Sequence, residues 1–268
     1  MSSQAFVPYC GHPPVPGALI WNTDPVLITA LLGIGAAYAW GCRGTGAPSP
    51  SERGLFGAGL AITAAALISP LCNLSVALFS ARVTQHIVLT LVAAPLVVLG
   101  RPDKAWAGIA GTHIRAACEG RHAMTLAGVA FAAAMWTWHL PGPYDATLQN
   151  NYVYWTMHVT TFGSALLLWH QLFLRQAERP AAALLVGFGT AMQMSLLGAV
   201  LTLAPRALFA VHFGTTSPWG LSPLQDQQLG GLIMWVPGGL LFTAYALVTL
   251  ALWLGDAREP VRPPQAAQ

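Results

Sequence analysis

Histidine is the residue whose number and placement in this chain indicate chemistry. The sequence contains eight histidines, and three of them, His86, His139 and His158, stand beside or inside long apolar segments. A neutral imidazole binds copper, zinc, iron and haem iron, and facing helices can point such side chains at a common centre. Because an ionisable residue within a membrane span is costly, these three histidines form a candidate metal site.

A structural role is the alternative for each of these histidines taken alone, because a single membrane histidine often hydrogen-bonds a neighbouring helix. The shared depth of the three on consecutive segments favours a common site. The other five histidines are expected in loops, in a terminal segment or at a membrane interface: His12, His113, His122, His170 and His212. His12 follows Cys10 closely enough to suggest a flexible metal pick-up site, although chance explains that pairing more simply.

Polar residues at the start of the last apolar segment are expected near the same site. Asp226 and Gln227 stand there in the stretch LQDQQLGGLIMW. A carboxylate or amide at this depth would orient a ligand histidine by hydrogen bonding from behind it. Helix capping is the competing explanation for Asp226, since aspartate at a helix start accepts backbone N–H bonds and favours the helix dipole.

The elements that position these residues are membrane spans. Only 8% of residues are charged and 55% are hydrophobic, with a mean hydropathy of +0.56. A soluble domain carries about 25% charged residues. The net charge of +3 is what cytoplasmic loops of a membrane protein require, so lipid is an expected partner and nucleic acid is not.

Apolar segments of spanning length set the fold class. A bilayer core of roughly 30 Å needs about 20 residues of helix, each rising about 1.5 Å. Seven segments qualify: approximately Pro25 to Trp40, Leu55 to Phe79, Val83 to Gly100, Met124 to Leu140, Tyr152 to Leu174, Ala181 to Ala204 and Leu229 to Leu254. They lack the alternation of barrel strands. The sequence therefore predicts an all-α, polytopic transmembrane helix bundle of about seven spans.

Basic residues predict the orientation. Cytoplasmic loops carry an excess of Lys and Arg. Two of the twelve lysines and arginines, Arg82 and Arg206, fall on the side predicted to be external. The other ten fall in alternate connections or after the last segment: Arg43, Arg53, Arg101, Lys104, Arg115, Arg121, Arg175, Arg179, Arg258 and Arg262. The N-terminus is thus predicted outside and the C-terminus inside, with the three histidines in the outer half.

The same segments divide the chain. Residues 1–24 are expected to form an external proline-rich tail, 25–255 the seven-span transmembrane domain and 256–268 a cytoplasmic tail. The start lacks the basic region and apolar core of a cleavable signal, so we expect the first span to stay uncleaved.

The four cysteines predict no disulfide framework, because two fall on each side of the membrane. The sequence also contains no P-loop, nucleophile elbow, HExxH or dinucleotide fingerprint, so no enzyme activity is expected.

Three stretches of the chain carry a family resemblance. SARVTQHIVLTLVAAPLVVLGRP, WTWHLPGPYDATLQNNYVYWTMHVTTFG and LQDQQLGGLIMWVPGG resemble the signature segments of the bacterial CtaG-type cytochrome c oxidase assembly factors, the seven-span family. The resemblance implies a role in maturing a haem-copper oxidase at a copper-dependent step in the bacterial cytoplasmic membrane. Its motifs place His86 in QH, His139 in WHLP, His158 in MH, and Asp226 and Gln227 in DQQ.

One position departs from the pattern. Members of the family often carry a further histidine four residues before the QH histidine, and this chain has Arg82 there. A site that uses that histidine pair is therefore excluded for this chain.

The residues and the resemblance together suggest one mechanism. A site of His86, His139 and His158 receives Cu(I) from the periplasmic side and presents it to a cytochrome c oxidase subunit by ligand exchange, without bond-making catalysis. Whether a periplasmic copper carrier supplies the metal stays open. Two alternatives also stay open: a haem-b-binding membrane redox protein with two of these histidines as axial ligands, and a metal-free assembly scaffold.

Overall fold

The computed structural model describes residues 6–107 and 119–256, whose regular elements are all helical, with no strand among them. The long helices are α1 (Pro25–Gly41), α2 (Pro50–Ile68), α8 (Ala123–Trp138), α10 (Asn151–Leu174), α11 (Pro180–Leu203) and α12 (Pro223–Asp256). The shorter elements are α3 (Pro70–Ala77), α4 (Phe79–Ile87), the π-helix η1 (Val88–Ala93), α5 (Ala94–Leu99), α6 (Pro102–Ala105), α9 (Pro141–Thr147), and the 3-10 turns η2 (Ala210–His212) and η3 (Ser217–Trp219).

Helix starts follow local sequence signals. Ser49 and Glu52 form a capping box at the start of α2, because each side chain bonds the backbone of the other. Asn150 caps α10 by accepting the N–H groups of Tyr152 and Val153. Proline occupies the first turn of α1, α2, α3, α6, α9 and α11, where its missing N–H costs nothing.

Helices α4 and α5 are joined through η1 into one continuous helical stretch, and its π-helical turn lies just before a proline. Pro95 cannot donate a backbone hydrogen bond, and its ring crowds the preceding turn. The π-helical turn of η1 lies just ahead of it. The Trp169 indole of α10 donates to the Thr90 carbonyl of this turn at 2.8 Å, so a side chain from a neighbouring helix satisfies part of the loosened backbone.

Three continuous helical stretches are long and apolar enough to cross a membrane: Phe79–Leu99, Pro180–Leu203 and Pro223–Gly255. The pair α2 and α3, bent by 47°, and the pair α8 and α9, bent by 80°, raise the number to five among the described residues if each pair is one span. Helix α1 is shorter, and polar residues lower the hydropathy of α10. The structure thus supports a multi-pass membrane protein, while the full set of seven spans stays a prediction.

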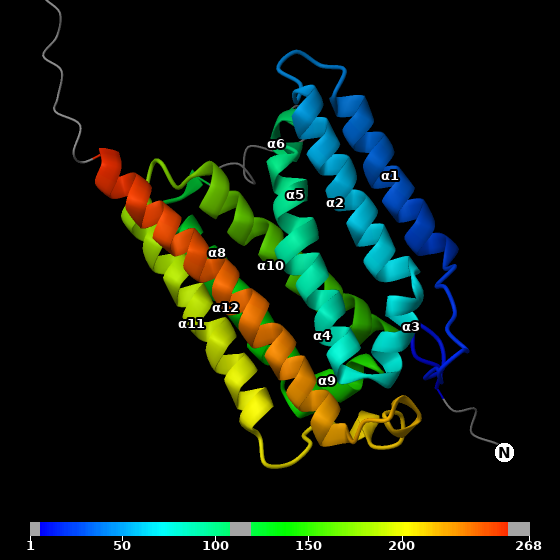
Figure 1. The fold of residues 1–268 in the computed structure, drawn as a ribbon. Helices are drawn as coiled ribbons and strands as arrows, with labels where there is room; N and C mark the ends of the chain where they lie inside the picture. Colours follow the sequence, from blue (N-terminus) through cyan, green and yellow to red (C-terminus); the bar gives the residue numbers. More distant parts are fainter. Residues whose placement is uncertain (1–5, 108–118, 257–268) are drawn as a thin grey trace, which may run out of the picture.

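The helices pack side by side as a bundle with two distinct ends (Figure 1). One end holds α3, α9, the start of α12 and the loop 204–222; because His86, His139 and His158 lie there, we call it the histidine end. The opposite end holds the α1–α2 connection, α6 and the end of α12. Helices α11 and α12 run antiparallel in close contact along their length.

Small residues allow this close approach of α11 and α12. Gly187, Ala191 and Ser195 belong to a four-residue repeat of small side chains on α11. A Cβ at Gly187 would lie 2.7 Å from the Tyr245 ring, and one at Gly198 would lie 2.7 Å from Trp235 Cβ. Small residues on α11 thus let the two helix backbones approach closely.

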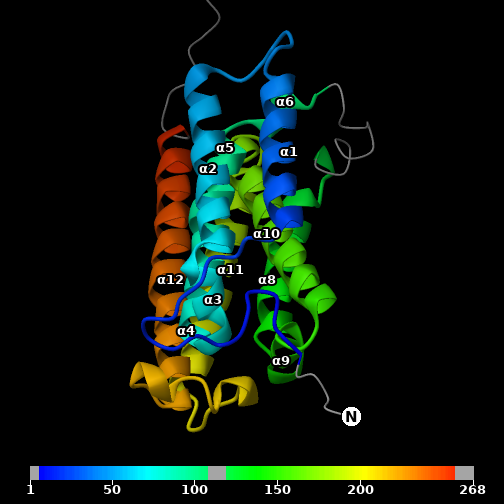
Figure 2. The same cartoon turned by 90° about the vertical axis from the view of Figure 1, so that its right-hand side faces the viewer.

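Residues 6–24, predicted as an external tail, form an ordered strap that crosses the bundle next to α3 and α10 (Figure 2). Tyr9 stacks on Tyr154 of α10 with ring centroids 4.9 Å apart. The Tyr9 hydroxyl also donates to the Asp24 carboxylate, and this hydrogen bond lowers the pKa of Asp24. Residues 1–5 and the predicted cytoplasmic tail beyond 256 lie outside the described residues.

Candidate functional site

The three predicted histidines meet at the histidine end. His86 lies in the last turn of α4, His139 is the residue that ends α8, and His158 lies two turns into α10. Their side chains are buried, with 3%, 4% and 5% of the residue surface exposed. Three helical segments spread over residues 86 to 158 thus place three imidazoles in one buried compartment, as their shared depth in the apolar segments predicts.

The distances between the rings are those of neighbouring side chains. The ring centroid of His86 lies 5.5 Å from that of His158 and 6.2 Å from that of His139. A nitrogen ligand about 2 Å from a metal puts its ring centroid about 3 Å from it, so two rings on one metal have centroids within about 6 Å of each other. His86 and His158 satisfy this condition, and His86 and His139 are at its limit.

Two of the rings are oriented by their own helices. His139 Nδ1 lies 2.6 Å from the Met135 carbonyl, and His158 Nδ1 lies 3.1 Å from the Tyr154 carbonyl. A carbonyl only accepts, so each Nδ1 carries the proton and each neutral ring keeps its lone pair on Nε2. Metal-binding histidines are commonly held in this way by a backbone carbonyl.

Three of the other imidazole nitrogens are without partners. His158 Nε2 and both nitrogens of His86 are buried and make no hydrogen bond. Buried polar atoms are usually paired, so unpaired ones call for an explanation such as a ligand. Among residues 6–107 and 119–256, however, no three His, Cys, Asp or Glu side chains lie close enough to hold a metal ion without moving. The imidazoles fit a metal in donor type and lone pairs, and ring rotation would have to complete the geometry.

Asp226, predicted to support a ligand histidine, caps the helix that carries His86. Its fully buried carboxylate accepts the N–H of Phe79 at 2.6 Å and the N–H and hydroxyl of Ser80 at 3.1 and 2.5 Å. These groups begin α4, whose N-terminus has no cap from its own chain neighbours. Asp226 therefore affects His86 by holding the start of α4 in place. Capping was the alternative expectation for Asp226, but the helix it caps is α4 and not its own helix α12.

Gln227 serves the loop before α12. Its side-chain oxygen accepts the N–H of Leu208 at 2.7 Å, and its amide donates to the Leu201 carbonyl at 3.1 Å. The next residues of the motif are small because α12 touches α4: a Cβ at Gly230 would lie 2.5 Å from the Phe79 ring. The DQQLGG stretch thus positions α4 and the loop, and histidine contact comes from other residues.

Arg82 corrects an expectation, because it is not a charge in an outer loop. It lies in α4 one turn before His86 and is 1% exposed. Its guanidinium donates to the Ser75 carbonyl at 3.2 Å and to the Thr147 hydroxyl at 2.8 Å. It also lies 5.5 Å from the centroid of the Tyr144 ring. The expectation of an outer-loop charge was therefore wrong for Arg82, because the short stretch between the two predicted segments belongs to the buried helix α4.

Aromatic residues close the compartment. The ring centroid of Tyr154 lies 4.2 Å from that of His158, and the ring centroid of Phe79 lies 6.2 Å from that of His139. The Tyr144 hydroxyl bonds His212 Nε2 at 2.7 Å. His212 lies in the loop 204–222, as expected, and its side chain is buried there, with 2% exposed. Loop residues 204–222 carry no periodic pattern, and nothing in the sequence indicated this contact.

The other histidines lie apart from the site. His12 and His122 are exposed, as expected, and His113 lies outside the described residues. His170 lines an apolar cavity of about 700 Å³ between α1, α2, α5 and α10. That cavity offers one imidazole, and its other lining residues are mostly apolar, with Asp103, Glu119 and Arg175 among them. The chemistry of the donors therefore favours the histidine end.

Cys10 and Cys72 contradict the expectation that no disulfide forms. They are bonded to each other with Cα atoms 5.5 Å apart across 62 residues of sequence. The expectation considered only pairs that would join the two sides of the membrane, whereas both of these cysteines lie at the histidine end. Cys42 is free, at the opposite end.

A family model described as cytochrome c oxidase caa3 assembly factor matches residues 36–256 of the chain. The matched range includes α2 to α12 and all three histidines of the compartment. No curated protein and no solved structure matches the chain.

Proposed function

Because this chain belongs to the cytochrome c oxidase caa3 assembly factor family, we propose that it delivers Cu(I) to a haem-copper oxidase through His86, His139 and His158. The cargo ion is received at the histidine end and passed to an oxidase subunit within the membrane. Each transfer exchanges one set of ligands for another, so the proposed role requires no catalysis. Association with cytochrome c oxidase follows from the family.

The orientation of the rings is the observation that carries this proposal. The Met135 and Tyr154 carbonyls hold the Nδ1 protons of His139 and His158, which leaves Nε2 as the ligand atom of each. The His86 ring makes no hydrogen bond, so it can turn toward a metal without losing one. Imidazole nitrogens of neutral rings bind copper without adding charge to a buried site.

The charge of Arg82 favours the monovalent ion. Coulomb repulsion grows with the charge of the bound ion and is strong in a low-dielectric interior. The Arg82 guanidinium lies one helical turn from His86. A divalent ion would meet twice the repulsion that Cu(I) meets, so this site suits Cu(I) better than Cu(II) or Zn²⁺.

Haem b fits the compartment less well than copper. Axial ligation by His86 and His158 requires the flat macrocycle to lie between the two rings. The rings instead meet edge to face at 79° with centroids 5.5 Å apart. Helix α4 would have to separate from α10 before a macrocycle could enter.

The proposed location is the bacterial cytoplasmic membrane, with the histidine end facing the periplasm. Two features support this orientation. Disulfides persist in oxidising compartments, and the Cys10–Cys72 bond is at the histidine end. Most of the described lysines and arginines are at the opposite end, as the positive-inside rule requires of the cytoplasmic side.

Replacement of single histidines tests the site. His86→Ala, His139→Ala and His158→Ala should each abolish oxidase maturation while the protein stays in the membrane, because a three-ligand site loses its closed shell. His122→Ala is the matched control, since His122 is exposed, and it should mature oxidase normally. Oxidase activity and haem spectra of membranes measure the outcome. Equal activity in all four variants would refute the histidine site.

External copper separates delivery from the alternatives. In a strain that lacks this protein, added copper should restore part of the oxidase activity, because concentration can replace affinity at about tenfold per 1.4 kcal/mol. A haem protein or a metal-free scaffold would not be replaced in this way. A strain that stays defective at every tolerated copper concentration would contradict the proposal, and a Soret band in the purified protein would favour haem.

A further inference from the structure

The Cys10–Cys72 pair lies in the wall of the histidine compartment. Cys10 is 4% exposed and Cys72 is fully buried. Cys72 belongs to α3, and Cys10 belongs to the strap of residues 6–24. The Asn73 amide holds the strap in place by donating to the carbonyls of Cys10 at 2.9 Å and His12 at 3.0 Å. Polar contacts next to the sulfur atoms would therefore keep the two cysteines together without the covalent bond.

Tyr154 links this pair to the histidines. Its hydroxyl oxygen lies 3.3 Å from Cys10 Sγ and 3.7 Å from Cys72 Sγ. Its ring lies against His158, with centroids 4.2 Å apart, and its carbonyl accepts from His158 Nδ1. One side chain thus separates two sulfur atoms from a buried imidazole.

A buried positive charge without a counter-ion lies beside the same tyrosine. The Arg82 guanidinium carbon is 5.8 Å from the centroid of the Tyr154 ring. Arg82 Nε donates to Ser75, one turn after Cys72 on α3, and Arg82 Nη2 is buried without a partner. In the described part of the chain no carboxylate lies within ion-pair distance of Arg82. Burying an unpaired charge is costly, so a ligand or state that brings negative charge would be stabilised here.

We propose that Cys10 and Cys72, when reduced, bind one Cu(I) as two thiolates, with Arg82 compensating the negative charge of the complex. Thiolates are the soft ligands that select Cu(I), and a nearby guanidinium favours the thiolate form. The pair would receive the copper cargo before the histidines do, and this part of the proposal rests on the proposed function. Cu(I) binding by the pair is a separate, measurable property.

Reduction of the Cys10–Cys72 disulfide requires a reductant, and a protein dithiol of the thioredoxin class supplies it. Its two thiols reduce the Cys10–Cys72 bond by thiol–disulfide exchange, so that one disulfide forms on the reductant as one is lost here. Both electrons and both protons pass to Cys10 and Cys72. Binding of Cu(I) then releases the two protons and leaves a complex of one negative charge, without any change in the oxidation state of copper.

Copper titration of the full-length protein in detergent tests this proposal. Cys42→Ser and Cys118→Ser leave only the pair as a source of thiols. One half of the sample stays oxidised, and the other is reduced with a phosphine that is then removed under nitrogen. Titration with Cu(I) against bicinchoninate should show one additional Cu(I) per chain in the reduced half, and X-ray absorption should show Cu–S bonds only there.

Two variants separate this site from the histidines. Cys10→Ser with Cys72→Ser should make copper binding independent of reduction. The triple variant His86→Ala, His139→Ala and His158→Ala should keep the reduction-dependent copper and lose only the copper bound by the histidines. If no histidine-dependent copper is found in the parent protein, the proposed function fails while the thiol site stands. Arg82→Met should weaken the thiol site by roughly ten- to thirtyfold, as expected for one charge at an effective dielectric of about 20.

Three results would overturn the proposal. The first is equal Cu(I) in the oxidised and reduced halves. The second is reduction-dependent copper that survives in the double cysteine variant. The third is a disulfide that the phosphine cannot reduce in the folded protein, since the pair would then serve only to fasten the strap.

Discussion

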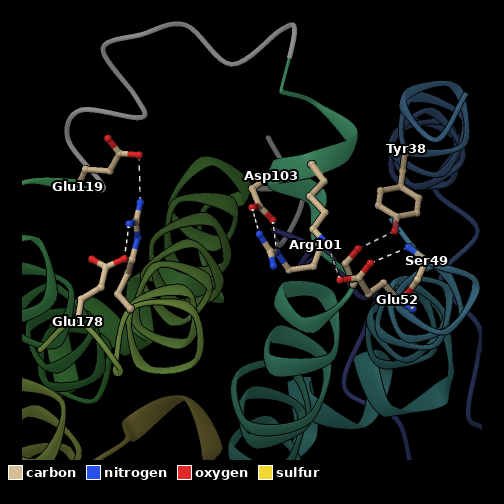
Figure 3. Close-up of polar contacts among 10 residues, drawn as sticks. Tyr38, Ser49, Glu52, Arg101, Asp103, Glu119 and Glu178 are labelled. Atoms are coloured by element: carbon tan, nitrogen blue, oxygen red, sulfur yellow. Dashed lines mark hydrogen bonds and ion pairs between the residues drawn. The ribbon is translucent and has the colours of Figure 1, made fainter. Parts of the chain in front are cut away.

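The two ends of the bundle hold their polar residues in opposite ways. All four ion pairs found among the described residues lie at the opposite end, where Arg101, Lys104 and Arg175 meet Glu52, Asp103, Glu119 and Glu178 on partly exposed surfaces (Figure 3). The histidine end instead buries several of its polar side chains, namely His86, His139, His158, His212, Tyr144, Tyr154, Arg82 and Asp226.

This difference indicates that the opposite end is a water-exposed surface and that the histidine end is the one suited to bind a ligand. Exposed ion pairs contribute little free energy, and salt screens them, so they mark a surface in contact with water. Buried imidazoles and a buried guanidinium cost free energy and persist where the surrounding helices enforce them. The end that is harder to build is therefore the one that we assign to metal transfer.

Reporter fusions should separate the two ends completely. A reporter active only in the periplasm should be active after Gln149, in the connection at the histidine end, and inactive after Glu178, at the opposite end. The physical reason is retention of basic connections in the cytoplasm. Reporter activity in intact cells measures this, and the reverse pattern would overturn the orientation of the two ends.

Removal of the Asp226 carboxylate should cause the largest loss of stability. Asp226→Ala leaves two backbone N–H groups and the Ser80 hydroxyl of α4 without their acceptor, which should lower the free energy of unfolding by about 2 to 3 kcal/mol. Unfolding in detergent by denaturant measures it. The control Asp103→Ala breaks a half-exposed pair at the opposite end, and a loss as large as that of Asp226→Ala would contradict the contrast.

Crowding between α12 and α4 should have the next largest effect. In Gly230→Ala the new methyl group would lie 2.5 Å from the Phe79 ring, so the helices must separate, at a cost of about 1 to 3 kcal/mol. Phe79 also contacts His139, so oxidase maturation should fall as well. Gly57→Ala is the control: its Cβ meets no atom within 4 Å, and it should gain up to about 1 kcal/mol of helix propensity.

The smallest effect is expected at an ion pair of the opposite end. Lys104→Met removes the 2.7 Å contact with Glu52, and the free energy of unfolding should change by about 0 to 1 kcal/mol. Repeating the unfolding measurement at roughly 1 M salt should remove even this difference. A larger, salt-independent loss would show that the opposite end is also held by buried polar contacts.

Depth along the apolar segments was enough to predict which histidines meet. His86, His139 and His158 share one end of consecutive segments, and helices that pack side by side bring equal depths together. The same argument said nothing about the burial of His212, because a loop without periodic pattern can place a side chain inside or outside. It failed for Arg82, where a position at the end of a segment did not distinguish a loop from the first turn of a buried helix.

Hydropathy and residue spacing in the sequence alone thus determined the all-helical class, the approximate helix positions and the three histidines, because these depend on neighbours along the chain. Tertiary structure decided the rest: the Cys10–Cys72 bond, the Tyr154 contact between sulfur and imidazole, and the helix that Asp226 caps. The disulfide, the Cys10–Tyr154 contact and the Asp226 cap join residues 62 to 147 positions apart. Their partners are chosen by how the helices pack, and no local pattern records that choice.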